Sequence, residues 1–420
     1  KANTPRLCIR RRLVSVSGPG RRLLAVALVG LLGMGVLATG TGFVGVAAAA
    51  NTAPDCSTVD YVDADSDGKL DVDTVNHLQC IEDEGLGNDY EITSDIDASE
   101  TKDWISGAGF APIGDDRNGF TGTFDGQGHT ISGLTIDRGS TSYVGLFASI
   151  GAGSEVRNVG LEGVDITADG RVGALGGENG GTIENSYATG DIDDSGGQAG
   201  GIVGVNVGEV RNVYADVDIT SSWHYVGGAI GDPASGSVSD SYAVGSVQAD
   251  GSYYEGGFTG WSTLRSGEVT DSYWDTETTG QDTSKDDNSV GLTTSQMQGS
   301  SPATNMGGLD FSNAWETVEA GGDATADGYP ILSGMDRQAQ LEAQGIYNQL
   351  PSVDSVTRVD STPTNADSVK YAVTFSSSAS NVDTGDFRVT QVSGDASGIV
   401  ASVDSSSGTT IRVSIGSISG

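Results

Sequence analysis

The stretch Val172-Gly-Ala-Leu-Gly-Gly-Glu-Asn-Gly-Gly-Thr-Ile-Glu-Asn-Ser-Tyr-Ala-Thr-Gly190 recurs in outline as Gly200-Gly-Ile-Val-Gly-Val-Asn-Val-Gly-Glu-Val-Arg-Asn-Val-Tyr214. The pattern occurs about five times between residues 144 and 274, at a spacing close to 27 residues. Two series of positions carry the period, a turn glycine and a polar residue: Gly145, Gly173, Gly200, Gly227 and Gly256, then Asn158, Asn185, Asn212, Asp240 and Asp271. So constant a period predicts a stacked array whose units bury their apolar faces against their neighbours.

Each repeat holds three short strand-like pieces separated by turn residues, as in residues 201–205, 209–214 and 216–220. Three strands in one repeat match one coil of a parallel β-helix, whose coils stack at about 4.8 Å. We therefore predict an all-β protein, a parallel β-helix (β-solenoid), with its repeat coils at 144–274. Equivalent side chains would form columns, with the asparagine series as one amide ladder. A second column would contain Tyr187, Tyr214, Tyr242 and Tyr273.

The segments around the repeats are assigned from composition and alternation. Residues 85–143 are expected to supply the entry strands of the β-helix. Residues 275–335 contain apolar side chains suited to a cap over the last coil, which otherwise exposes an unpaired strand edge. Residues 336–352 are predicted to be a linker with a short helix. Residues 353–420 are predicted to be a partial, truncated immunoglobulin-like β-sandwich, because residues 373–375 and 411–415 alternate between apolar and polar types.

Residues 1–50 have the features of an export signal. Arginines at 10–12 and 21–22 precede an apolar run that begins at Leu23, and a small-residue cluster ends at Ala50. A membrane anchor is the alternative reading of this segment. No later stretch is long and apolar enough to cross a membrane, so we expect no transmembrane span in the mature chain. The expected location is secreted or cell surface.

The remaining chain is strongly acidic. Seven of the 21 Lys and Arg residues lie in 1–50, which has no acid, so 14 remain against 57 Asp and Glu, a net charge of −43. A nucleic-acid partner is excluded, because such proteins need basic surface to displace counterions from phosphates. An acidic, lysine-poor surface stays soluble where salt screens its self-repulsion, which favours a halophilic source. A calcium-loaded surface protein at lower salt is the competing interpretation.

Residues 51–84 are predicted to be an acidic leader with a calcium loop and a short helix that Asp73 caps. The calcium ligands we expect are Asp63, Asp65, Asp67, Asp71 and Asp73. Alternate aspartates around Gly68 place several hard oxygens on one side of a tight loop, as calcium requires. Thr74 stands where an EF-hand has its bidentate glutamate, and solvated aspartates without a metal are the plainer alternative. Cys56 and Cys80 are expected to form a disulfide or to stay as two free, buried thiols.

The two quoted stretches resemble the GLUG motif, named for its Gly-Leu-x-Gly core. The resemblance extends over about residues 90–332, although the first repeat has Phe147 and Gly160 where glycine and tyrosine are expected. GLUG arrays occur in large exported surface proteins, including bacterial IgA-cleaving metalloproteases and many haloarchaeal surface proteins. The resemblance implies surface location and structural repetition, and it implies no catalytic residue, because the motif has none. Residues 355–387 are similar, more loosely, to an immunoglobulin-like or cadherin-like module of adhesins.

Catalytic chemistry has few candidates. The histidines His77, His129 and His224 form no metal-binding motif, and there is no Gly-x-Ser-x-Gly elbow. For Trp223-His224-Tyr225 at a coil junction we expect a packing role, with stacking on a sugar as the alternative. Enzyme activity would rest on carboxylates that neighbouring coils place on one face. The acids in question are Asp191, Asp193, Asp194, Asp216 and Asp218.

The sequence therefore predicts a secreted or cell-surface, non-catalytic repeat protein, an adhesin or an envelope component. Its expected partner is a cell-surface or extracellular polymer, with carbohydrate as one candidate. The alternatives are a carbohydrate-active β-helix enzyme, a polysaccharide lyase or hydrolase, and a stalk for a catalytic domain beyond Gly420. The sequence does not identify the ligand-binding residues.

Overall fold

The computed structural model describes residues 52–250, 254–261, 269–347, 353–359, 368–379, 382, 384, 387, 397–405 and 407–419. The predicted export signal at 1–50 lies outside these residues. The chain divides into two compact units, one that ends at Tyr347 and one that contains the segment from Asn348 onward. Each unit is described by itself. Among the described residues, no helix has the length and apolar character needed to cross a membrane.

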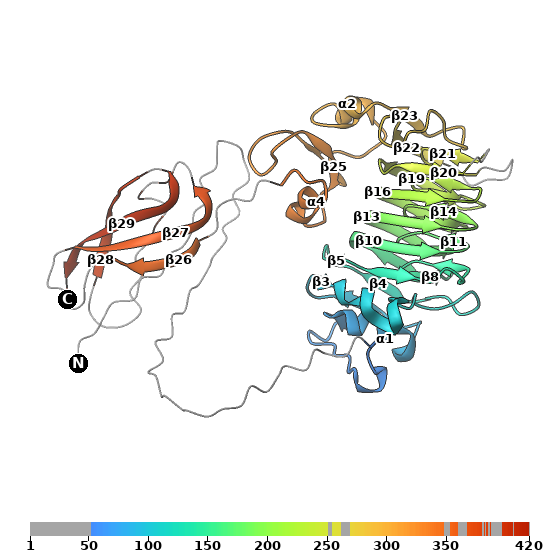
Figure 1. Ribbon diagram of the computed structural model, residues 1–420, viewed down its shortest axis with the longest axis horizontal. Helices are drawn as coiled ribbons and strands as arrows, with labels where there is room; N and C mark the ends of the chain where they lie inside the picture. The colour runs from blue at the N-terminus through green and yellow to red at the C-terminus, as the bar shows by residue number, and fades with distance from the viewer. Residues whose placement is uncertain are drawn as a thin grey trace. The chain divides into compact units, whose positions relative to one another are not determined.

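In the first unit, short parallel strands stack on one another in three sheets (Figure 1). The largest sheet contains β1 (Leu70–Val72), β2 (Tyr90–Ile92), β3 (Ile96–Asp97), β4 (Thr123–Asp125), β5 (Thr130–Ser132), β6 (Thr135–Asp137), β9 (Glu155–Arg157), β10 (Gly160–Ala168), β13 (Thr182–Asp194), β16 (Glu209–Ser221), β19 (Ser237–Ala243), β20 (Val247–Ala249), β22 (Val269–Asp275) and β23 (Val290–Leu292). The second contains β7 (Tyr143–Val144), β11 (Arg171–Val172), β14 (Gln198–Gly200), β17 (Val226–Gly227) and β21 (Glu255–Gly256). The third contains β8 (Phe147–Ile150), β12 (Gly176–Asn179), β15 (Val203–Asn206) and β18 (Ile230–Asp232).

The pairing register follows the sequence period. β13 pairs in parallel with β16, with Tyr187 opposite Tyr214 and Ala188 opposite Ala215. Inside the coils, one apolar column has a buried residue from every successive strand: Val156, Ile183, Val210, Val238 and Val269. Each such side chain removed from water contributes about 1.5–3 kcal/mol. The predicted parallel β-solenoid is confirmed.

The recurring polar residue of the repeat occupies a left-handed backbone position. The φ angles of Asn158, Asn185 and Asn212 are 53°, 47° and 49°, and those of Asp240 and Asp271 are 53° and 46°. Asparagine and aspartate tolerate this region far better than other side chains with a Cβ. Of the predicted amide ladder, one amide-to-amide bond is present, from Asn212 Nδ2 to Asn185 Oδ1 at 3.2 Å. The backbone conformation therefore explains the repeated residue better than side-chain stacking does.

A second pair of amides forms a buried ladder at another corner. Asn179 Nδ2 donates to Asn206 Oδ1 at 2.8 Å, and both side chains are buried. Each Oδ1 also accepts the N–H two residues further on, from Gly181 at 3.0 Å and from Gly208 at 3.2 Å. These bonds satisfy polar groups that would otherwise be costly in a dry corner. This pair was not predicted from the sequence.

The leader closes the N-terminal end of the solenoid. It contains η1 (Cys56–Thr58) and α1 (Val75–Glu84), and η2 (Ser99–Gly107) follows β3. Thr74 caps α1 by accepting the N–H of His77 at 3.3 Å, so the predicted cap at Asp73 is wrong by one residue. The helix places Leu78 and Ile81 in the same core as β1 and β2. It therefore covers the apolar end of the first coils.

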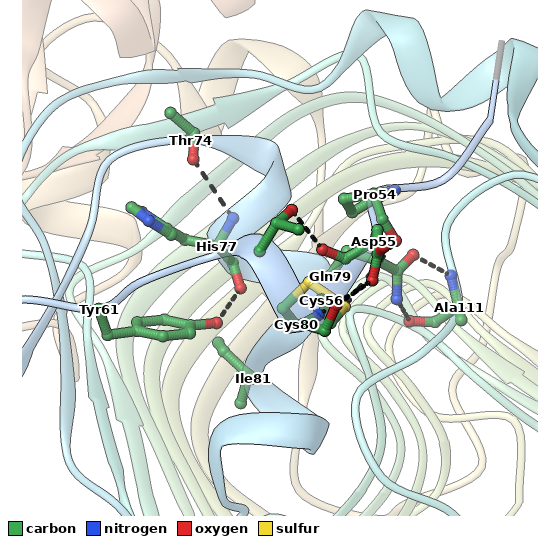
Figure 2. The surroundings of a disulfide bond; sticks show 12 residues. Pro54, Asp55, Cys56, Tyr61, Thr74, His77, Gln79, Cys80, Ile81 and Ala111 are labelled. Carbon is green, nitrogen blue, oxygen red and sulfur yellow. Dashed lines mark hydrogen bonds between the residues drawn. A yellow bond between two sulfur atoms is a disulfide. The ribbon is translucent and has the colours of Figure 1, made fainter. Parts of the chain in front are cut away.

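Figure 2 shows how the leader is held. A disulfide joins Cys56 to Cys80 of α1. Gln79 pairs with the backbone of Ala111 through two hydrogen bonds, of 2.9 and 3.2 Å, and Tyr61 donates its hydroxyl to the His77 carbonyl. One covalent bond and several polar contacts thus attach α1 to the chain on both sides of it.

The segment after the last coil lies on the flank of the solenoid, which corrects the simple cap that the sequence predicted. β23 extends the sheet past β22, as a cap would. Residues 293–347, the C-terminal strap, then form α2 (Thr294–Met297), α3 (Pro302–Asn305), β24 (Trp315–Val318), β25 (Gly328–Leu332) and α4 (Arg337–Ala343). Trp315 Nε1 donates to Asn212 Oδ1 at 3.3 Å, and Asp336 N donates to the carbonyl of Gly128 at 3.2 Å. The strap therefore contacts coils well before the last one.

The tyrosine column explains this course. The rings of Tyr187 and Tyr214 stack at 4.8 Å and those of Tyr214 and Tyr242 at 5.2 Å. These rings point out of the solenoid and form a separate core with Trp315, Leu332 and other strap residues. Because an outward column of aromatic rings would expose a large apolar surface, it needs a cover. The predicted tyrosine stack is present for these three members, and the strap covers it.

The helix predicted at 336–352 as a linker is part of this cover. Leu341 of α4 is fully buried against Val318 and Ile331. Gln340 is also buried, and its side chain bonds both the N–H and the carbonyl of Leu332, at 2.8 and 3.0 Å. Packing of the first unit therefore continues to Tyr347.

The second unit contains one antiparallel sheet among its described residues. Its strands lie in the order β26 (Val353–Arg358), β27 (Val369–Ala379), β29 (Gly408–Ser419) and β28 (Ser397–Val403). The predicted alternation is confirmed, because Val373, Phe375, Ile411, Val413 and Ile415 are all buried. The arrangement fits a β-sandwich, and its immunoglobulin-like character stays a prediction.

Candidate functional site

The acidic loop of the leader brings three of the five predicted metal ligands together. One carboxylate oxygen from each of Asp63, Asp65 and Asp67 lies within 4.8 Å of the others. The tight turn is formed at Gly68, whose φ of 95° suits glycine. Asp71 and Asp73 have other contacts: Asp71 accepts the N–H of Ala64 at 3.3 Å, and Asp73 pairs with His77 Nδ1 at 2.9 Å.

Hydrogen bonds from the loop itself occupy part of this oxygen cluster. Asp63 accepts the N–H groups of Asp67 at 3.1 Å and Gly68 at 3.0 Å. The Lys69 ammonium lies 2.8 Å from Asp67 and is the first cause of the lowered pKa of that carboxyl. The donor set suits a hard cation such as calcium, which prefers carboxylate oxygens. Lys69 would compete with the ion for Asp67.

An acid-lined hollow of about 320 Å³ lies beside the start of α1. Its carboxylates belong to Asp73, Asp95, Asp97 and Glu100. Asp95 lies 3.0 Å from His129 Nδ1 and accepts the N–H of Thr130 at 3.1 Å, while a hydrogen bond from Ser99 lowers the pKa of Asp97. His129 is thus a local hydrogen-bonding residue, and two of the four carboxylates hold backbone in place.

The acids proposed for catalysis divide between two faces. Asp191 lies in register between Asp165 and Asp218, and burial followed by these two charges raises its pKa. Asp194 points inward and is buried. It accepts the N–H groups of Gly196 and Gly170 at 3.1 and 3.2 Å and the hydroxyl of Ser221 at 3.0 Å. Asp194 is therefore a corner residue and does not join the outward acids.

Among these acids, Asp216 is the outward-facing one whose pKa is raised most. It follows Tyr214 by two residues in β16 and so faces the same side as the tyrosine column. Burial, with the charge of Asp218 second, raises its pKa to about 6. Asp193, by contrast, lies between Thr167 and Thr220 on the exposed surface. The structure thus has one column of carboxylates, formed by Asp165, Asp191 and Asp218, and the half-buried Asp216 beside it.

The basic groups near the coils are used in ion pairs. Arg211 contacts Glu184 and pairs with Glu209 at 3.1 Å, and Arg171 contacts Glu178. The guanidinium of Arg171 also lies over the ring of Tyr143, with its carbon 5.0 Å from the ring centre. No arginine or lysine side chain in the described residues forms an ion pair with Asp191, Asp216 or Asp218 at 4.0 Å or less.

Aromatic side chains gather at one corner of the solenoid, next to β17 and β21. We call this group the aromatic corner; it consists of Trp223, His224, Tyr225, Tyr254 and Trp261. Trp261 packs edge-on against Tyr254 at 4.5 Å and against Tyr225 at 4.8 Å. The sequence singled out only 223–225, because Tyr254 and Trp261 come from the next coil. The pairing of Val226 with Glu255 brings the two segments together.

Comparison with known proteins supports the repeat assignment. The family model of the GLUG motif matches residues 168–193, which cover the end of β10 through β13. The chain is 30% identical to halomucin of Haloquadratum walsbyi over 350 residues, 73% of this chain. It is 40% identical over 118 residues, 27% of this chain, to a protein of Evansella cellulosilytica named as a Gly-rich membrane protein. No solved structure matches the chain.

These relatives are much longer proteins. The matched region spans 4% of halomucin and 14% of the Evansella protein. The motif match covers one coil, and neighbouring coils pair with it in register on both sides. The chain is therefore a GLUG-motif repeat protein built as a parallel β-solenoid.

Proposed function

We propose that this protein is a non-catalytic scaffold of the cell surface or the secreted space, an adhesin or an envelope component. The names of the two relatives support the location. The main support for the proposal is the continuous parallel register from β9 to β22. The polar residues that recur in it occupy left-handed backbone positions, so their role is structural. Repeats of this kind present a long, rigid surface by stacking units that contact only their neighbours.

Localisation tests this proposal. The full reading frame, tagged after the predicted signal, would be expressed in a haloarchaeal host, and cells would be treated with an external protease. We expect the tag in the medium or in the protease-sensitive envelope fraction. Retention of the protein in a protected cytoplasmic fraction would contradict the proposal. A variant with the arginines at 21–22 replaced by glutamine is the control for dependence on the signal.

A carbohydrate-active enzyme is the second candidate, and the half-buried Asp216 favours it. Asp216, with a pKa of about 6, lies near Asp218, which is in register with Asp191, and such a group of carboxyls is one that glycoside chemistry can use. The test is a panel of neutral and uronic polysaccharides assayed for new reducing or unsaturated ends. Turnover that disappears in Asp216→Asn or Asp191→Ala would replace the scaffold proposal by this one. Absence of turnover from the wild-type protein would remove it.

We also propose that the leader binds calcium through Asp63, Asp65 and Asp67. The alternating spacing and the clustering of these three oxygens support the proposal. Calorimetric titration of the purified protein with calcium should show weak binding of the extracellular kind, with a Kd on the order of 10⁻⁴–10⁻³ M. Asp65→Ala should abolish the heat, and Lys69→Ala should strengthen binding. Equal heats from wild-type protein and Asp65→Ala would contradict the assignment.

A further inference from the structure

The aromatic corner replaces a glycine corner of the preceding coil. The pairings of Asp194 with Ser221 and of Ala199 with Val226 fix the register across the turn between them. Ser195-Gly196-Gly197-Gln198 of one coil therefore corresponds to Ser222-Trp223-His224-Tyr225 of the next. At Gly197 an added Cβ would lie 2.0 Å from the carbonyl oxygen of Gly170, so the earlier corner requires glycine. The later corner carries two aromatic rings and a histidine in the same places.

This replacement has structural costs. Tyr225 has a φ of 69°, a left-handed conformation that is an outlier for a bulky side chain. Among the described residues, no group hydrogen-bonds to the buried Nδ1 of His224. Trp223 keeps 49% of its surface exposed. A stack of coils needs none of these features, since Gly196 and Gly197 close the same turn one coil earlier. The strained backbone of Tyr225 and the unsatisfied nitrogen of His224 lie in the same corner, and this combination indicates a role in binding.

The rings form an edge that a ligand can reach. Tyr225 and Tyr254 come from neighbouring coils and lie 5.2 Å apart, with Trp261 packed edge-on against both. His224 lies between the exposed Trp223 and Tyr254, with ring centres 5.2 and 6.1 Å away. The corner thus presents the exposed indole of Trp223 beside the imidazole ring and the rings of two tyrosines. Tyrosine and tryptophan suit a ligand that is apolar on one face and polar at its edge.

The chemistry selects one class of partner. The C–H face of a sugar packs well on the face of an aromatic ring, because the π-electrons give that face a partial negative charge. The hydroxyls of the sugar then form hydrogen bonds with polar groups around the aromatic ring. The net charge of −36 opposes a polyanion, and the acidic surface offers no cationic field to attract one. A specific protein partner uses about 20–30 residues a side, whereas this feature is confined to one corner.

We propose that the aromatic corner binds a neutral polysaccharide, with the exposed Trp223 as the principal stacking residue. This inference deepens the proposed surface role by naming the class of polymer that the scaffold contacts. Since it concerns a binding property of the isolated protein, it can fail while the localisation result holds.

Affinity electrophoresis of the whole chain tests the proposal, in gels that contain hydroxyethylcellulose, dextran or yeast mannan, with anionic alginate as the contrast. The key variant restores the glycine corner, Trp223→Gly with His224→Gly and Tyr225→Gln. It should fold at least as well as the wild type, because it copies the corner one coil earlier. Trp223→Ala is the single-site variant, and Val207→Ala is the control, since Val207 is 43% exposed in the turn after β15. Circular dichroism and thermal unfolding check folding.

We expect at least one neutral polysaccharide to retard the wild-type protein and Val207→Ala equally. Trp223→Ala should bind about tenfold more weakly or worse, and the restored glycine corner should not bind. The proposal is overturned if none of the neutral polymers retards the wild type, or if the glycine-corner variant is retarded as strongly. Self-association in sedimentation velocity that Trp223→Ala abolishes would identify the corner as a protein contact and would also overturn it.

Discussion

The leader and the C-terminal strap both close surfaces of the solenoid, but they do so by different physical means. The leader covers the end of the first coils with one helix, and the Cys56–Cys80 disulfide fixes that helix. The strap covers the flank with aromatic packing and buried amide bonds, and it has no disulfide among the described residues. An end exposes one strand edge, whereas a flank repeats its exposed side chain in every coil. The flank therefore needs the longer cover.

The largest expected effect is on the flank. Tyr214→Ala removes the central ring of the column, which is almost fully buried and packs near Trp315. We expect a loss of about 3–5 kcal/mol in the free energy of unfolding, measured by denaturant titration, because the substitution leaves a cavity. Hydrogen exchange should rise in residues 325–347 and not in the leader. Tyr214→Phe should cost about 1 kcal/mol or less, since the hydroxyl bond to Gln340 is long, at 3.4 Å. Equal losses from both variants would contradict the packing role.

The next effect is on the leader. Replacement of Cys56 and Cys80 by serine opens a loop with a sequence separation of 24 residues. The expected cost is about 3 kcal/mol, because the unfolded leader gains conformational freedom. Exchange should increase in α1 and leave the strap unchanged. Increased exchange in the strap would show that the two covers are coupled and would contradict their independence.

The smallest effect is the pH dependence of the flank. The pKa of Asp216 is raised to about 6 by burial and by Asp218. Its ordinary value is 3.8, so the stability that the protonated form contributes is complete below about pH 4 and is lost as the pH rises through 6. Asp216→Asn should therefore stabilise the protein at pH 7 by roughly 2 kcal/mol and have little effect at pH 4. Asp193→Asn, on the exposed surface, is the control. A gain that does not change between pH 4 and pH 7 would refute this cause.

The period of the repeat was sufficient to predict the coils, because one 27-residue unit repeats its own packing. The asparagine series was read as an amide ladder, yet aspartate follows in two coils, which is the signal that backbone conformation sets the position. The strap could not be predicted in its place, since its contacts join residues such as Tyr214 and Gln340 that are far apart in sequence. The sequence also did not show that the tyrosine column faces outward, because alternation alone does not tell which face of β13 and β16 lies against the core.

The candidate site was predictable only in part. Aspartates at alternate positions predicted the cluster of Asp63, Asp65 and Asp67, but Lys69 and His77 engage neighbouring carboxylates in ways that spacing does not reveal. The aromatic corner needed the partner coil, because Tyr254 and Trp261 belong to a later repeat. A repeat-by-repeat alignment of the sequence would have shown the glycines at 196–197 replaced at 223–224.

Thiol cross-linking tests the stacking of coils most directly. Cysteines at Asp193 and Thr220 occupy exposed, paired positions one coil apart. Cysteines at Asp193 and Val207 lie half a coil apart and serve as the control. In the folded protein, with the native disulfide intact, mild oxidation should link the one-coil pair and leave the half-coil pair free. A link in the half-coil pair with none in the one-coil pair would show hairpins in place of stacked coils and would contradict the solenoid.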